Sequence, residues 1–233
     1  RGNAMDYEKW AEEEGLDSWG YQQCLPYFKK AESQLDGDEK FHGREGPLKL
    51  EVGPCENPLF KAWLKAGEES GYGLTDDNNG ERQEGFAPFN RNVSKGKRLS
   101  SARAYFHPVK KRKNLKLICR ALTTKLVMEG KRVVGVEFRK GKNGQLQRVM
   151  GREVISCGGA INSPQLLQLS GIGDKEHLES VGVGCVHHLP GVGENMQDHL
   201  EVYVQHSCTK PVSMAPALKW YNKPWIGFKW FFF

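Results

Sequence analysis

The sequence lacks several features that would assign it quickly to a class. It has no apolar run near the roughly 18 residues that a membrane-spanning helix needs. No CxxC pair, GxSxG elbow or HExxH helix occurs, which argues against the common redox, hydrolase and metalloprotease motifs. There are no internal repeats and no low-complexity tract. The six cysteines are too sparse for a disulfide scaffold, so we interpret them as reduced thiols. They are Cys24, Cys55, Cys119, Cys157, Cys185 and Cys208.

What is present indicates a folded chain with one large domain or two modest ones. The 233 residues are 38% hydrophobic and 10% aromatic, which excludes the low-hydrophobicity class of disordered proteins. Lys and Arg number 34 against 28 Asp and Glu, a net charge of +6. This mild excess is compatible with anionic ligands and does not require nucleic acid.

Hydrophobic periodicity and turn residues predict a mixed α/β fold, with helices and strands interspersed. We expect helical structure within 1–35, where Asp17 or Ser18 could cap a helix start, and in a helix opening at Asn57-Pro58. The remaining predicted helices cover 99–107, 163–170 and 174–182. The predicted strands cover 48–52, 115–118, 122–128, 133–138, 149–156 and 201–207.

Two clusters invite functional interpretations that the spacing does not favour. The basic run over 110–116 resembles a nucleic-acid site, but no aromatic side chain lies within it to stack on bases, so we favour a solvated loop. The histidines and cysteines over 185–208 match no standard zinc spacing, which argues against a metal site. Three GxG tripeptides near the same region do not complete GxGxxG and are interpreted as turns.

The strongest signal is the segment 156–173, SCGGAINSPQLLQLSGIG. A strand ending in two glycines allows the backbone to approach a ligand closely. Ser163 could cap the following helix, whose free N–H groups and positive dipole suit a phosphate or an electron-rich ring. An ordinary strand–turn–helix packing unit explains the spacing equally well.

This segment resembles the second signature of the glucose–methanol–choline (GMC) flavin oxidoreductases. The later segment 189–199, LPGVGENMQDH, resembles the next motif of that family. Further matches, closest to its choline-oxidising members, are RGNAMDY at 1–7, CLPYFKKAE at 24–32 and QEGF at 83–86. The resemblance covers essentially the whole chain.

The resemblance implies an FAD-binding GMC oxidoreductase fold that is incomplete here, with the start of a sheet-based substrate domain. Residues 1–107 are then a helical and loop region covering the flavin. Residues 108–194 are part of the FAD-binding domain, and 195–233 begin the substrate-binding domain. The family's N-terminal GxGxxG is absent from this sequence.

By position, the resemblance places Thr123 against the adenine part of FAD through its main chain. Cys157, Gly158 and Gly159 then lie at the strand end nearest the cofactor. No catalytic residue is assigned, because the catalytic histidine of the family is expected beyond Phe233. His199, within the Gln-Asp-His motif, is expected to be structural, and its neighbours Asn195, Gln197 and Asp198 to hold the crossover between domains.

The implied reaction is oxidation of an alcohol, here choline to betaine aldehyde, by hydride transfer to flavin. The implied acceptor is a component of the respiratory chain, with peripheral membrane association at the mitochondrial inner membrane or, alternatively, the bacterial cell membrane. Two other functions stay open: another GMC alcohol dehydrogenase or oxidase, and a non-enzymatic binding fragment. The 233-residue chain alone is expected to be inactive and to retain little FAD.

Overall fold

The computed structural model describes residues 1–141 and 143–232. Its contacts divide the chain into two compact units, one formed by 1–115 and 205–233 and the other by 116–204. Within the described ranges, no helix has both the length and the apolar character needed to cross a bilayer. This division by contacts does not test the functional division predicted at 107 and 194, which stays a prediction.

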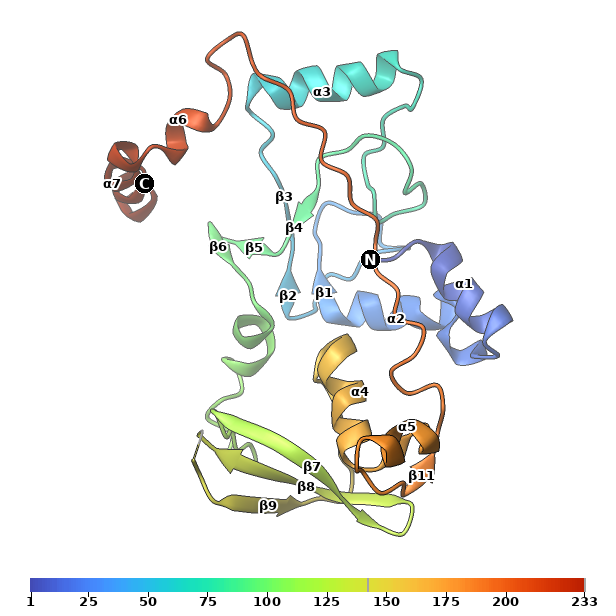
Figure 1. Cartoon of the computed structure of the whole chain (residues 1–233). Helices are drawn as coiled ribbons and strands as arrows, with labels where there is room; N and C mark the ends of the chain where they lie inside the picture. The colour runs from blue at the N-terminus through green and yellow to red at the C-terminus, as the bar shows by residue number, and fades with distance from the viewer. Residues whose placement is uncertain (142, 233) are drawn as a thin grey trace. The chain divides into compact units, whose positions relative to one another are not determined.

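The second unit, 116–204, is built on a three-stranded antiparallel sheet. Its strands are β7 (Ala121–Glu129), β8 (Arg132–Lys140) and β9 (Leu146–Met150), with β8 in the centre (Figure 1). Alternation places Leu126 and Phe138 inward, at 5% and 4% exposure. The register shifts between Thr123 and Lys125, so the strand is irregular beside one of the predicted site residues.

Helix α4 (Gly159–Leu169) packs beside β7, and a buried serine ties the two together. The Ser170 hydroxyl is fully buried, accepts a hydrogen bond from the Leu126 main-chain N–H (2.9 Å) and donates to the Leu166 carbonyl (2.6 Å). One hydroxyl therefore satisfies a strand donor at an irregular edge and adds a second hydrogen bond to a carbonyl in the last turn of the helix, which also accepts the Ser170 N–H.

We expect Ser170→Ala to destabilise the second unit by about 1–3 kcal/mol, because it leaves the buried Leu126 N–H without its partner. Amide hydrogen exchange at Leu126 in the full-length protein is the direct measurement. Ser180→Ala is the matched control, since the Ser180 hydroxyl bonds only the His177 carbonyl on an exposed helix. Equal exchange at Leu126 in both variants would contradict this role.

The remainder of this unit consists of short elements after α4. Strands β10 (Ile172–Gly173) and β11 (His187–His188) pair in parallel around helix α5 (Lys175–Ser180). Asp174 caps α5 by accepting from the His177 N–H at 2.9 Å, and Leu178 is 1% exposed. The predicted helix over 174–182 is therefore confirmed, two residues shorter at its C-terminal end.

The first unit is a set of helices and short strands. Helix α1 (Ala4–Glu13) opens with a reciprocal capping box between Asn3 and Asp6. Helix α3 (Pro58–Glu69) opens as predicted, with Asn57 accepting from the Leu59 N–H at 2.8 Å. The other helices are η1 (Asp17–Trp19), α2 (Tyr21–Ala31), the π-helix η2 (Ala102–Phe106), α6 (Ala215–Leu218), η3 (Trp220–Asn222) and α7 (Lys223–Phe232).

The strands of this unit are all two residues long. They are β1 (Glu32–Ser33), β2 (Leu48–Lys49), β3 (Glu51–Val52), β4 (Asn90–Arg91), β5 (Val93–Ser94) and β6 (Lys97–Arg98). β1 and β2 pair in parallel, whereas β3–β4 and β5–β6 pair in antiparallel fashion. The single strand predicted over 48–52 is thus divided at Leu50 between two sheets.

Three predicted strands do not form as predicted. Residues 115–118 and 201–207 form no strand, and the prediction over 149–156 holds only to Met150, where β9 ends. The pattern was strand-like, but a strand needs a ladder partner, and among the described residues these segments have none. The sequence 142–145, in which Asn143-Gly144 is typical of a hairpin turn, includes Lys142, which lies outside the described residues.

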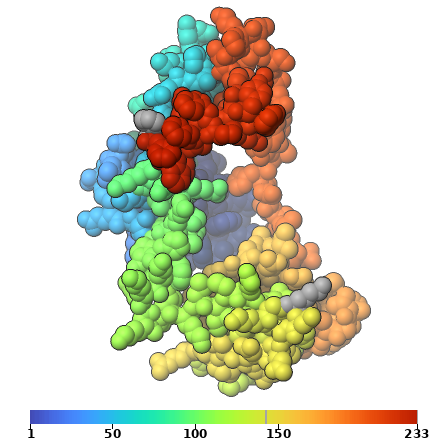
Figure 2. All heavy atoms as spheres, turned by 90° about the vertical axis from the view of Figure 1, so that its left-hand side faces the viewer, coloured from blue at the N-terminus to red at the C-terminus, as the bar shows by residue number. Residues whose placement is uncertain are grey.

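One other local prediction needs correction. Neither Asp17 nor Ser18 caps α2, because Asp17 starts the separate helix η1 and Gly20 precedes α2. Leu59, Trp63 and Ala66 share one face of α3 by their spacing, and all three are exposed, whereas Gly67 packs under Phe86. Aromatic side chains of α7 are also exposed, and its red atoms lie at the surface in Figure 2.

Candidate functional site

A cavity of about 430 Å³ lies within the second unit, bounded by β7, β8, the segment 154–158 and helix α4. Its wall mixes aliphatic and polar side chains, and none of its lining side chains carries a charge. The lining residues are Ala121, Leu122, Thr123, Leu126, Val136, Val154, Ile155, Ser156, Cys157, Gly158, Asn162, Gln165, Leu166 and Leu169. An uncharged wall that mixes aliphatic side chains with hydrogen-bonding groups suits a flat heteroaromatic ring better than a free anion.

One side of this cavity is a turn that is held by hydrogen bonds to the Ser163 hydroxyl. The Gly158 N–H donates to Ser163 Oγ at 2.9 Å, and the Ser156 and Ser163 hydroxyls are 3.0 Å apart. Ser163 is therefore not the helix cap predicted from the sequence: α4 begins four residues earlier, and Ser163 reaches back to brace the turn. Gly159 follows at φ +88°, a backbone conformation that favours glycine.

The structure gathers three of the four sequence-predicted cofactor residues on one cavity. Thr123 enters it from β7, and Cys157 and Gly158 from the end of the segment before α4. Gly159 follows Gly158 as the first residue of α4 and is not one of the lining residues. A Cβ at Gly159 would meet no atom within 4 Å, so there is open space beside this residue.

Sequence reasoning missed the helix side of the cavity. Asn162, Gln165, Leu166 and Leu169 line it from α4. Their spacing of three, four and seven residues from Asn162 places them on one helix face. That spacing was visible in the sequence, but the predicted helix began at residue 163 and so excluded Asn162.

The later motif residues lie apart from this cavity. Asn195 adopts φ +53°, and its side chain accepts from Gln197 at 3.4 Å. The side chains of Asp198 and His199 are almost fully exposed. The contacts of these residues are local, and their predicted role in a crossover between domains stays a prediction.

Solved oxidoreductases share this fold. Pyridoxine 4-oxidase from Mesorbium loti superposes with a TM-score of 0.75 at 32% identity, over 82% of this chain and 37% of its own. An FAD-dependent oxidoreductase from Chaetomium thermophilum superposes with a TM-score of 0.78 at 27% identity, over 85% of this chain and 36% of its own. These matches define an oxidoreductase fold of which the chain forms a part.

The chain belongs to the GMC oxidoreductase family, whose sequence profile matches residues 1–201. Relatives named oxygen-dependent choline dehydrogenase occur in Staphylococcus saprophyticus, 58% identical over the whole chain, and in Staphylococcus xylosus, 57% identical over 99% of it. The chain spans 41% of the length of each. The family resemblance of the sequence motifs is thereby confirmed.

Proposed function

We propose that the protein to which this chain belongs is an FAD-dependent dehydrogenase that oxidises choline to betaine aldehyde. The observation that carries the proposal is 58% identity, over the whole chain, to a relative named for this activity. Loss of a hydride from the alcohol carbon and of a proton from the hydroxyl oxygen converts the alcohol to the aldehyde. Bound FAD supplies the two-electron acceptor for this hydride.

The cavity in the second unit fits part of such a cofactor. Its uncharged wall of aliphatic and hydrogen-bonding side chains suits a flat heteroaromatic ring. We propose that Thr123 holds the adenine part through its main-chain groups. We propose also that Cys157, Gly158 and Gly159 let the chain approach the cofactor closely, with the N-terminus of α4 contributing its free N–H groups.

We assign the segments of the chain accordingly. Residues 1–107 cover the flavin, 108–194 contribute to the FAD-binding domain, and 195–233 begin the substrate domain. The base that takes the hydroxyl proton is assigned to no residue here, because neither His199 nor His206 has a structural setting for it. His199 is fully exposed, with only the adjacent Asp198 carboxylate near its ring. A general base needs a positioned partner and reach to the proton.

The proposal extends to the electron acceptor and to the cellular location. We propose a respiratory-chain acceptor and peripheral association with the bacterial cell membrane, since the curated relatives are staphylococcal and give no support to a mitochondrial location. The name of those relatives offers oxygen as the competing acceptor. Oxygen uptake by the purified full-length protein, measured with and without bacterial membranes, separates the two: uptake that requires membranes supports the respiratory acceptor.

A second candidate is oxidation of a different alcohol, favoured by the similarity to pyridoxine 4-oxidase. The full-length protein should have a kcat/KM for choline at least about tenfold above that for its uncharged isostere 3,3-dimethylbutan-1-ol, because a quaternary ammonium gains cation–π and charge interactions that the isostere lacks. Equal kcat/KM for the two alcohols would favour the second candidate over choline.

A further inference from the structure

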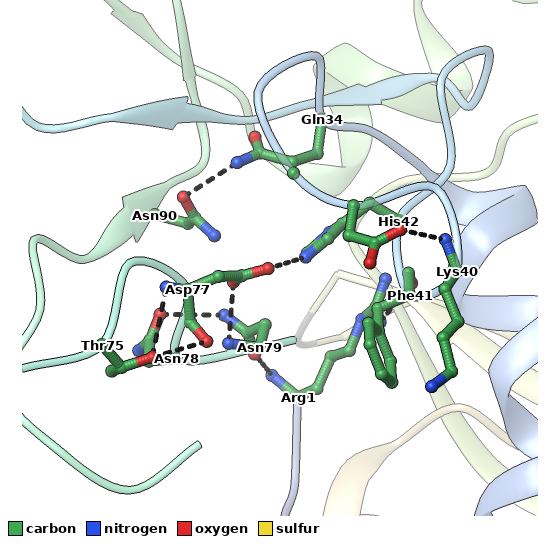
Figure 3. Close-up of polar contacts among 12 residues, drawn as sticks. Arg1, Gln34, Lys40, Phe41, His42, Thr75, Asp77, Asn78, Asn79 and Asn90 are labelled. Atoms are coloured by element: carbon green, nitrogen blue, oxygen red, sulfur yellow. Dashed lines mark hydrogen bonds and ion pairs between the residues drawn. The ribbon is translucent and has the colours of Figure 1, made fainter. Parts of the chain in front are cut away.

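A buried histidine, His42, joins two carboxylates in the first unit, whereas the proposed cofactor residues belong to the second. Figure 3 shows its contact with Asp77. The His42 side chain is 1% exposed. Its Nδ1 lies 2.7 Å from Glu32 Oε1, at the start of β1, and its Nε2 lies 2.7 Å from Asp77 Oδ2, in the loop after α3. A glycine, Gly37, packs directly on the ring, and a Cβ there would lie 2.4 Å from it.

This geometry favours the doubly protonated imidazole when both carboxylates are ionised. An ionised carboxylate only accepts hydrogen bonds, so both ring nitrogens must donate, and only the imidazolium carries both protons. The pKa of His42 is raised above 6.5, chiefly by the hydrogen bond to Glu32; burial opposes the rise, and Asp77 adds to it.

The surrounding charges balance this cation. The Arg1 guanidinium also donates to Glu32, so two cations and two anions form one network. Two further charged residues contact neighbouring main chain and not the ring: Arg44 donates to the Gln34 and Gly37 carbonyls, and Asp38 accepts from the His42 N–H through its carbonyl. Lys40 bonds through its main-chain N–H to the Asp38 carboxylate.

The His42–Asp77 pair is the buried link between the loop carrying Asp77 and the 32–46 region. The base of the loop is held separately, because the Thr75 N–H donates to the Phe86 carbonyl and the Phe86 N–H donates to the Gly73 carbonyl. Just beyond the loop, the Lys40–Glu81 pair at 3.6 Å is exposed and therefore weak. The same loop supplies Asn79, which lines a cavity of about 280 Å³ together with Arg1, Glu32 and Asn90. Asp77 orients Asn79 by accepting its N–H at 2.9 Å. Release of the loop would therefore remove one wall of this cavity.

We propose that His42 is a pH-sensitive lock: its proton holds the 71–80 loop against Glu32, and loss of that proton releases the loop and opens the cavity beside it. Loss of the proton leaves a ring nitrogen lone pair facing a carboxylate at 2.7 Å, which is repulsive. The lock therefore requires a carboxylate on both sides of the ring.

The direction of the pH dependence follows from the raised pKa of His42. The stabilisation that protonated His42 gives to the folded state is fully present below pH 6.5, the ordinary pKa of the side chain. It is lost as the pH rises through the higher pKa that His42 has in the folded state. Alkaline pH should therefore loosen the loop, whereas a drop toward pH 6 should not.

The test is hydrogen exchange of the 71–80 peptide in the full-length protein, corrected for intrinsic rates, at about pH 5.5 and about pH 9.5. At the lower pH, His42→Gln should exchange about tenfold or more faster than the unsubstituted protein, because it loses a charge-assisted bond. At the higher pH the two rates should converge. His177→Gln, at an exposed histidine of α5, is the matched control and should match the unsubstituted protein at both pH values.

An equal ratio of exchange rates at both pH values would mean a merely structural histidine and would overturn the proposal. If His42→Gln does not fold, Asp77→Asn provides the second variant, because it removes one of the two anions that hold the proton. Its loop should exchange faster at the lower pH and change less between the two pH values. Pronounced pH dependence retained in Asp77→Asn would equally overturn the lock.

Discussion

Gly171→Ala is expected to lower the stability of the second unit by about 2–4 kcal/mol. Gly171 has φ +84°, where an L side chain is strained. A Cβ there would also lie 2.5 Å from the Gly184 carbonyl oxygen and 3.1 Å from the Val186 nitrogen. The Val186 N–H donates to the Gly171 carbonyl at 2.7 Å. The steric clash of the added methyl group therefore cannot be relieved without disrupting the start of the β10–β11 pairing.

Gly182→Ala is the matched control for this variant. Gly182 has nearly the same backbone conformation, φ +80°, but a Cβ there meets nothing within 4 Å. Both variants incur the conformational strain, so the difference between them isolates the steric conflict with Gly184. Denaturant unfolding of the full-length proteins, followed by exchange of the 170–190 amides, measures it. Equal loss of stability in the two variants would contradict the close approach.

Gly158→Val is expected to abolish retention of FAD by the full-length protein, while Thr123→Ala leaves retention unchanged. A Cβ at Gly158 would lie 3.1 Å from both the nitrogen and the hydroxyl of Ser163, so a branched side chain must displace the braced turn. Thr123 is proposed to act through its main chain, which alanine preserves. The measurement is the flavin-to-protein ratio after gel filtration.

Thermal unfolding of the apoproteins is the control for this pair, because it separates loss of the cofactor site from loss of the fold. Flavin retained at the unsubstituted level in Gly158→Val would remove the turn from the site. Loss of flavin in Thr123→Ala would show that its side chain is needed, contrary to a main-chain role.

The parts of the fold that the sequence predicted best are those stabilised by local interactions. The helix opening at Asn57-Pro58, the helix over 174–182 and the adjacent strands over 122–128 and 133–138 all depend on neighbouring residues, and all of them form. The strand predicted over 115–118 fails because pairing is non-local, and the alternation of side chains does not specify a partner. For the same reason, the alternation over 48–52 did not predict that the strand is divided at Leu50 between two sheets.

The candidate site was predictable in part for a related reason. Gly158 and Gly159, at the start of α4, and the resemblance of their motif located the turn, but not the hydrogen bonds from Ser163, which lies inside the helix. The His42 network left no trace in the sequence pattern, because Glu32, His42 and Asp77 come from separate segments joined only by folding. Clusters of this kind have no fixed spacing.

The full-length protein is proposed to bind FAD and to pass the electrons of choline to it. The most direct measurement is the visible absorbance of the purified protein, without oxygen, before and after choline is added. We predict an oxidised flavin spectrum that choline bleaches, with betaine aldehyde formed in step. A full-length protein without flavin, or one whose flavin spectrum choline leaves unchanged, would contradict the account.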